Sequence, residues 1–164
     1  MPDIEGLYFT GPGWWAMLDR ELKDMYDVDK VLNGVCVKEK FGQARVEYDN
    51  FSPVRAGFVQ MYEEIVQNKS TETCELCGKR GTLRTDRNRM QCRCERCDKA
   101  SKEERNEIMR ETVDRYKKAL AQIVSYLPKG IELTEREAAA IRYGVQCRGE
   151  LDSIMNRIIR RHGS

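Results

Sequence analysis

The chain has 164 residues, of which 40% are hydrophobic, and its 29 basic and 27 acidic side chains give a net charge of +2. This length suits one compact domain or two small ones. No apolar run approaches the roughly 20 residues that a membrane-spanning helix needs, and the first five residues contain two acids rather than the basic start of a signal peptide. We therefore expect a cytoplasmic protein with no membrane contact.

Residues 1–70 predict a small α+β unit. After the turn Gly11-Pro12-Gly13, apolar residues recur at helical spacing up to Met25, with polar residues such as Asp19 between them. Residues 35–48 then alternate between apolar and polar around Phe41-Gly42, which predicts a β-hairpin. The expected order is helix, hairpin, helix.

The second helix of this unit is expected from Pro53 to about Asn68, because Ser52-Pro53 is a typical helix start. Its predicted apolar stripe, which would face the core, consists of Val54, Phe58, Met61 and Ile65.

Residues 71–100 contain five of the seven cysteines. In a reducing compartment, such a cluster predicts metal binding rather than disulfides. Cys74 and Cys77 form one Cys-x-x-Cys pair, and Cys94 and Cys97 form a second pair after sixteen intervening residues. Two such pairs predict a central zinc ribbon in which four thiolates surround one structural Zn²⁺. Cys92 falls outside this spacing, although an exchange of Cys92 for Cys94 in the ligand set stays open.

Residues 101–164 predict a helical tail of about three helices. Ser101 with Glu104, and Thr134 with Glu137, have the spacing of capping boxes. The first helix carries an apolar seam at heptad spacing, formed by Met109, Val113, Tyr116, Leu120, Ile123 and Leu127. This seam needs a partner, which is either the last two helices of the chain or, in a homodimer through residues 109–127, a second copy.

We expect no enzymatic activity. Four cysteines close the coordination shell of a zinc ion, whereas a catalytic zinc keeps a position open. The only histidine, His162, lies near the C-terminal end, and the sequence contains no nucleophile elbow, phosphate loop or paired-carboxylate motif.

Several segments together resemble a known family. Gly11-Pro12-Gly13-Trp14-Trp15, the run Lys38-Glu39-Lys40-Phe41-Gly42 and the two cysteine pairs are similar to small zinc-ribbon proteins encoded by bacteriophages and prophages. The resemblance covers about residues 11–98 and implies a viral origin, a host-cell cytoplasm as the location and a zinc site. It implies no particular activity.

Charge predicts an anionic partner for the ribbon and the tail. Residues 71–100 carry eight basic and five acidic side chains, and residues 142–164 carry five and two. We expect a binding protein that contacts nucleic acid through basic ribbon residues. The candidate contact residues are Lys79, Arg80, Arg84, Arg87, Arg89, Arg93 and Arg96.

Two other functions stay open. The acidic N-terminal third and the long seam favour an adaptor or inhibitor that binds a host protein of defence or transcription. Leu133-Thr134-Glu135-Arg136-Glu137 also resembles the opening of the helix-turn-helix in response-regulator transcription factors, which implies that the last helix would enter the major groove of DNA.

Overall fold

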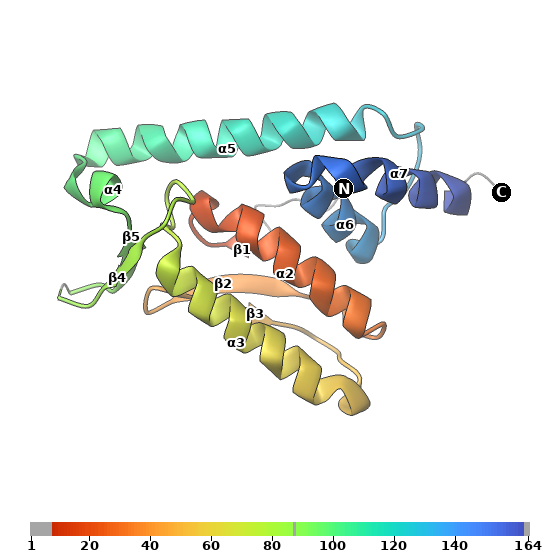
Figure 1. Ribbon diagram of the computed structural model, residues 1–164, viewed down its shortest axis with the longest axis horizontal. Helices are drawn as coiled ribbons and strands as arrows, with labels where there is room; N and C mark the ends of the chain where they lie inside the picture. Colours follow the sequence, from red (N-terminus) through yellow and green to blue (C-terminus); the bar gives the residue numbers. More distant parts are fainter. Residues whose placement is uncertain (1–7, 87, 163–164) are drawn as a thin grey trace.

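The first half of the chain combines a small sheet with two helices (Figure 1). The computed structural model describes residues 8–86 and 88–162, and its class is mixed α and β, as the sequence predicts. In chain order, the elements are β1 (Tyr8–Phe9), the 3-10 helix η1 (Pro12–Trp14), α2 (Trp15–Val28), β2 (Cys36–Lys40), β3 (Gln43–Glu47), the 3-10 helix η2 (Pro53–Arg55) and α3 (Ala56–Glu72).

The hairpin lies where the alternation predicts it. β2 and β3 pair antiparallel, with Lys40 opposite Gln43, and both residues of the connecting turn, Phe41 and Gly42, have positive φ. This conformation matches the twist of the flanking strands. The sequence does not predict β1, which pairs parallel to β2 and completes a sheet of order β1-β2-β3, because two residues are too few to show a periodicity.

The predicted apolar stripe of the second helix is wrong. Val59 and Val66 are buried, whereas Val54, Phe58 and Met61 are 87%, 48% and 43% exposed. The inward face is fixed by its contact with β3, where the hydroxyl of Ser70 accepts a 2.9 Å hydrogen bond from the backbone N–H of Ala44. An apolar patch around the start of α3, formed by Phe51, Val54, Phe58 and Met61, is therefore left exposed.

The cysteine segment forms a second, two-stranded sheet that projects at one end of the molecule (Figure 1). β4 (Thr82–Arg84) pairs antiparallel with β5 (Gln91–Arg93), and the short helix α4 (Glu95–Lys99) follows directly. α4 lies beneath the first turns of α5 (Lys102–Val124), so the ribbon and the long helix meet at this end (Figure 1).

The tail contains α5, α6 (Glu135–Gln146) and α7 (Arg148–His162). Both predicted capping boxes are confirmed, because Ser101 and Thr134 each accept from the backbone of the glutamate three residues later, and that glutamate bonds back. Among the described residues, no helix has the length and apolar character that a membrane crossing requires.

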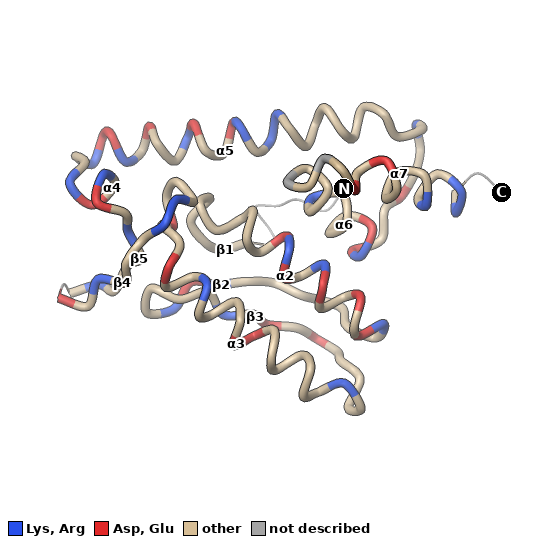
Figure 2. Tube along the Cα trace, viewed as in Figure 1, with Lys and Arg blue, Asp and Glu red and all other residues tan. Residues whose placement is uncertain are grey.

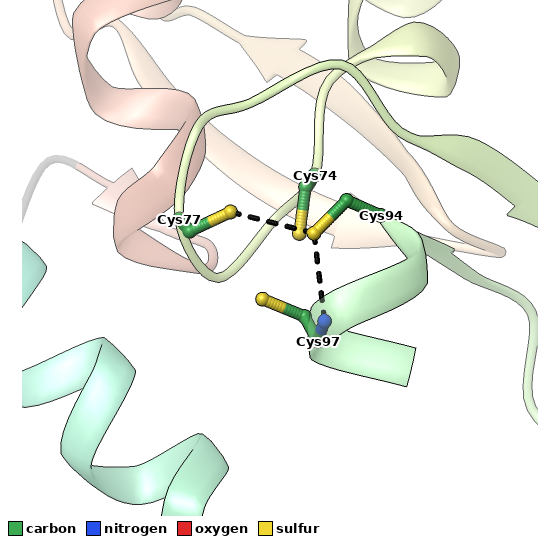
Figure 3. A group of neighbouring side chains, drawn as sticks. All are labelled: Cys74, Cys77, Cys94 and Cys97. Carbon is green, nitrogen blue, oxygen red and sulfur yellow. Dashed lines mark hydrogen bonds between the residues drawn. The ribbon is translucent and has the colours of Figure 1, made fainter. Parts of the chain in front are cut away.

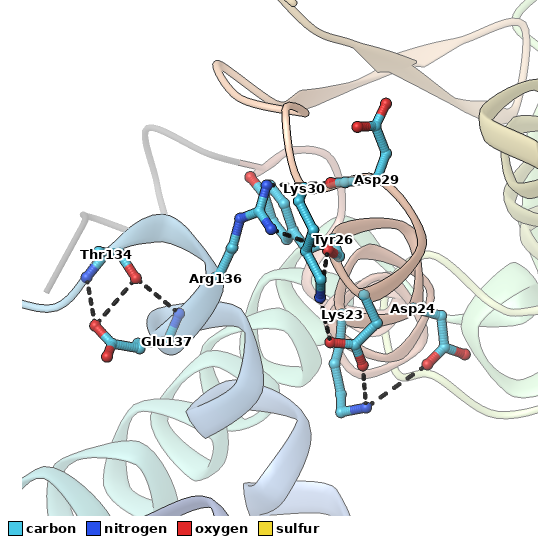
Figure 4. Close-up of polar contacts among 9 residues, drawn as sticks. Lys23, Asp24, Tyr26, Asp29, Lys30, Thr134, Arg136 and Glu137 are labelled. Carbon is cyan, nitrogen blue, oxygen red and sulfur yellow. Dashed lines mark hydrogen bonds and ion pairs between the residues drawn. The ribbon is translucent and has the colours of Figure 1, made fainter. Parts of the chain in front are cut away.

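The tail helices share one hydrophobic core with the N-terminal sheet and helices. Tyr116, Leu120 and Ile123 of the seam are buried in the same cluster as Leu18 and Leu22 of α2. At the other end of α2, the guanidinium of Arg136 donates to the backbone carbonyls of Tyr26 and Asp29, at 3.3 and 3.1 Å (Figure 4). These contacts place α6 directly on α2.

Candidate metal centre

The sulfur atoms of Cys74, Cys77, Cys94 and Cys97 lie within 4.8 Å of one another and point toward a common centre (Figure 3). The Sγ atoms of Cys77 and Cys94 are 3.7 Å apart. A tetrahedral ion with zinc–sulfur bonds of about 2.3 Å requires sulfur–sulfur separations of about 3.8 Å. The four residues therefore form a cluster that can hold a metal ion, and the donor set suits zinc.

The first cysteine pair lies on a tight turn after α3. The N–H of Gly78 donates to the carbonyl of Cys74 at 2.9 Å, and the N–H of Cys74 donates to the carbonyl of Lys79 at 2.7 Å. Gly78 has a φ of +76°, a conformation that glycine adopts without strain. The turn brings the thiols of Cys74 and Cys77 to the same side.

The second pair uses the start of a helix instead of a turn. Cys94 is the N-cap of α4, and its sulfur accepts a hydrogen bond from the backbone N–H of Cys97 at 3.5 Å. One helical turn separates the two residues, which places both sulfurs on the side of the first pair (Figure 3). A sulfur at this end of a helix is also favoured as the thiolate.

The thiols differ in acidity. Burial raises the pKa of Cys77 and Cys97. Burial also opposes ionisation of Cys94, but hydrogen bonds from the Cys97 backbone and from neighbouring thiols lower the pKa of Cys94 to about 7. A divalent cation would displace the remaining protons, because the thiolate is the form that coordinates metal.

The segment before α2 contacts the turn that carries Cys74 and Cys77. The sequence did not predict this contact. The N–H of Gly13 donates to the carbonyl of Glu75 at 2.8 Å, and the indole nitrogen of Trp14 donates to the carbonyl of Thr73 at 2.6 Å. A Cβ atom on Gly13 would lie 2.2 Å from the carbonyl oxygen of Cys74. Glycine is thus required where the two backbones touch. The Gly-Pro-Gly-Trp run is the sequence feature from which this contact could have been predicted.

The first turns of α5 close the opposite side of the centre. Ile108 packs in a small cluster with Cys74, Leu76 and Cys97. The guanidinium of Arg105 donates to the carbonyl of Cys97 at 3.1 Å, which satisfies the C-terminal end of α4. The centre is therefore held between the N-terminal segment and the helical tail.

Cys92 does not belong to the group of four converging sulfurs. Its thiol donates to the carbonyl of Thr71 at 3.1 Å and is fully buried, and burial raises its pKa to about 12. In the β4–β5 register Cys92 is opposite Leu83, so its side chain joins the main hydrophobic core.

The basic candidate residues are not equally available. Lys79, Arg80 and Arg96 are exposed and form no ion pair among the described residues, whereas Arg89 pairs with Glu39 at 3.0 Å and the buried Arg93 pairs with Glu75 at 2.7 Å. Arg84 is half-buried, and Arg87 lies outside the described residues. Figure 2 shows basic positions on the turn before β4, on the strands and on α4.

No protein-family model matches this chain, and searches of curated proteins and of solved structures give no match either.

Proposed function

We propose that this chain is a non-enzymatic binding protein in which one structural zinc ion holds the ribbon in shape. The observation that carries the proposal is the convergence of four cysteine sulfurs within 4.8 Å. Four thiolates complete a tetrahedral shell and leave no coordination position for a substrate. The ion would contribute chiefly to folding, because the two short strands of the ribbon bury little surface of their own.

The ribbon contacts the phosphate backbone of nucleic acid in this proposal. Lys79, Arg80 and Arg96 support it, because they are exposed cations on the turn and helix that carry the cysteine pairs and form no ion pair within the described residues. A cation without an ion pair is available to phosphate, whereas Arg89 would first have to give up Glu39.

Binding of labelled single-stranded oligonucleotides, measured by fluorescence anisotropy, tests this proposal. The double variant Lys79→Glu/Arg80→Glu should weaken binding at low salt by at least about tenfold and reduce the salt slope by about 1.4, because single-stranded binding scales by about 0.7 per phosphate contact. A matched control, Lys118→Glu/Lys129→Glu, makes the same change in charge at exposed positions of α5 and the turn after it. Equal losses in both variants would show only an effect of net charge and would contradict the proposal.

A second candidate, protein binding, is favoured by the exposed apolar patch of Phe51, Val54, Phe58 and Met61. Exposed aromatic and methionine side chains are typical of the centres of protein interfaces. A host protein is the partner that we propose for this patch. A pull-down from nuclease-treated host lysate should recover a protein with the wild type and with Gln60→Lys, an exposed control on α3, but not with Val54→Lys/Phe58→Lys.

A further inference from the structure

A hollow of about 540 Å³ lies on the ribbon beside the metal centre. Its basic lining residues are Arg80, Arg84, Arg93 and Lys99, and the hydroxyl-bearing Thr82 and the thiol-bearing Cys94 also contribute. The acidic lining residues are Glu95 and Asp98. The hollow therefore contains an excess of positive charge within a small volume.

The strand register brings two of these arginines together. In the β4–β5 ladder, Thr82 is opposite Arg93 and Arg84 is opposite Gln91. Side chains two apart on a strand share a face, so Arg84 and Arg93 are diagonal neighbours on the face of the ladder opposite Leu83 and Cys92. Two guanidinium groups side by side repel each other unless an anion lies between them or close by.

The two guanidinium groups have unused donors. Nε of Arg84 and Nη1 of Arg93 are buried and have no hydrogen-bond acceptor. The side chain of Arg93 is only 9% exposed, and its Nη2 already donates to Oε1 of Glu75 at 2.7 Å. Buried polar groups in proteins are almost always hydrogen-bonded, and two orphaned donors at one place indicate a missing acceptor.

The acidic residues of the hollow do not supply that acceptor. Glu95 is bound to Lys99 at 2.5 Å, and Asp98 has an interaction of its own. Oδ1 of Asp98 is a buried acceptor in the same lining, but it accepts from neither of the two arginine donors. An oxyanion with several acceptor atoms is the ligand that this arrangement lacks.

We propose that this hollow is a phosphate-binding site in which Arg84 and Arg93 are the principal ligands and Arg80, Lys99 and the hydroxyl of Thr82 surround them. The planar guanidinium group matches the oxygen geometry of phosphate. This site deepens the proposed nucleic-acid function and rests on it when the bound group is a backbone phosphodiester. Free inorganic phosphate is the other source of the same chemical group.

A phosphate titration of the zinc-loaded protein tests the site itself. Inorganic phosphate, followed by NMR of the arginine Nε–H groups, should shift the signal of Arg84 with saturation, and Arg84→Gln should weaken phosphate binding by about tenfold, as expected for loss of a charged hydrogen-bond donor. Arg110→Gln is the matched control, because Arg110 is an exposed arginine of α5 that does not line the hollow. An unchanged Arg84 signal, or equal effects of the two variants, would overturn the proposal.

A structural role for Arg84 predicts a different result. A zinc ion with four thiolates carries a net charge of −2, and nearby guanidinium groups would neutralise it. In that case Arg84→Gln would weaken zinc binding while phosphate would leave both proteins unchanged, which would also overturn the proposal.

Oligonucleotides distinguish the two sources of phosphate. A single strand with phosphodiester linkages should displace inorganic phosphate from the Arg84 signal, and a strand with uncharged methylphosphonate linkages should not. Displacement by neither strand, with phosphate still binding, would support a free-phosphate site and count against the proposed nucleic-acid function. Strand binding that leaves Arg84 unaffected, with no phosphate binding, would sink the site and leave the proposed function standing.

Discussion

Nε of Arg142 donates a 3.1 Å hydrogen bond to Oδ1 of Asp19, although 123 positions separate the two residues in the chain. Both are fully buried. The hydroxyl of Tyr8 donates to the same oxygen at 2.7 Å, and that of Tyr116 donates to Oδ2 at 2.5 Å. One carboxylate thus joins β1, α2, α5 and α6, and it ties the helical tail to the N-terminal sheet and helices.

Removal of the cation from this network should be strongly destabilising. Arg142→Met would leave the Asp19 carboxylate buried without a counter-charge, and we expect the free energy of unfolding to fall by about 3–5 kcal/mol. The double variant Asp19→Leu/Arg142→Met removes both charges and should recover part of that loss. Urea denaturation gives the free energy of unfolding of the wild type and both variants. A loss below about 1 kcal/mol in Arg142→Met would contradict this role of the network.

The same carboxylate makes stability depend on pH. Burial raises the pKa of Asp19 from 3.8 to about 6, against the opposing effects of Arg142 and the tyrosine hydroxyls. Between these values the folded state binds more protons than the unfolded state, so this contribution to stability is gained as pH falls through 6 and is lost as pH rises.

Other carboxylates titrate in the same range, so the comparison uses Asp19→Asn, which cannot titrate. The stability of the wild type relative to Asp19→Asn should increase by about 1 kcal/mol between pH 7 and pH 5. Denaturation curves at several pH values measure the difference. A constant difference, or one that decreases toward pH 5, would show that the pKa of Asp19 is not raised.

Two glycine substitutions should change stability in opposite directions, because Gly13 touches the cysteine turn and a Cβ atom at Gly57 would touch nothing. Gly13→Ala places a Cβ atom 2.2 Å from the carbonyl oxygen of Cys74 and should cost about 1–3 kcal/mol, because backbone on both sides must move. Gly57→Ala lies in α3 with no atom within 4 Å of the new Cβ and should stabilise the protein by about 0.5–1 kcal/mol. Thermal unfolding compares them, and a neutral Gly13→Ala would show that the contact is looser than described.

Two cysteine substitutions test whether Cys94, and not Cys92, is a zinc ligand. Cys92→Ser should keep one zinc ion per chain, because its thiol contacts the carbonyl of Thr71. Cys94→Ser should lose zinc, because it removes one of the four converging sulfurs. Metal analysis of both purified proteins gives the stoichiometry, and the reverse pattern would place Cys92 in the ligand set.

Features encoded by local spacing could be predicted from the sequence. The cysteine pairs and the capping boxes at Ser101 and Thr134 depend on residues three apart, and the β2–β3 hairpin depends on alternation around Phe41-Gly42. In each case the geometry of a single turn or strand decides the outcome. The class of fold and the candidate metal ligands follow from such patterns.

Features that depend on distant contacts could not be predicted in this way. α3 contains two overlapping apolar stripes, and only its packing on β3 selects Val59 and Val66 over Phe58 and Met61. Asp19 occupies a polar position in the pattern of α2, yet it is buried because Arg142 arrives from α6. No local periodicity records such a partner.

X-ray absorption at the zinc edge, on reduced protein purified without chelator, tests the central claim most directly. We expect one zinc ion per chain with four sulfur neighbours at about 2.3 Å and no nitrogen or oxygen ligand. Protein that is folded yet free of zinc, or a zinc ion with mixed or fewer sulfur ligands, would contradict it.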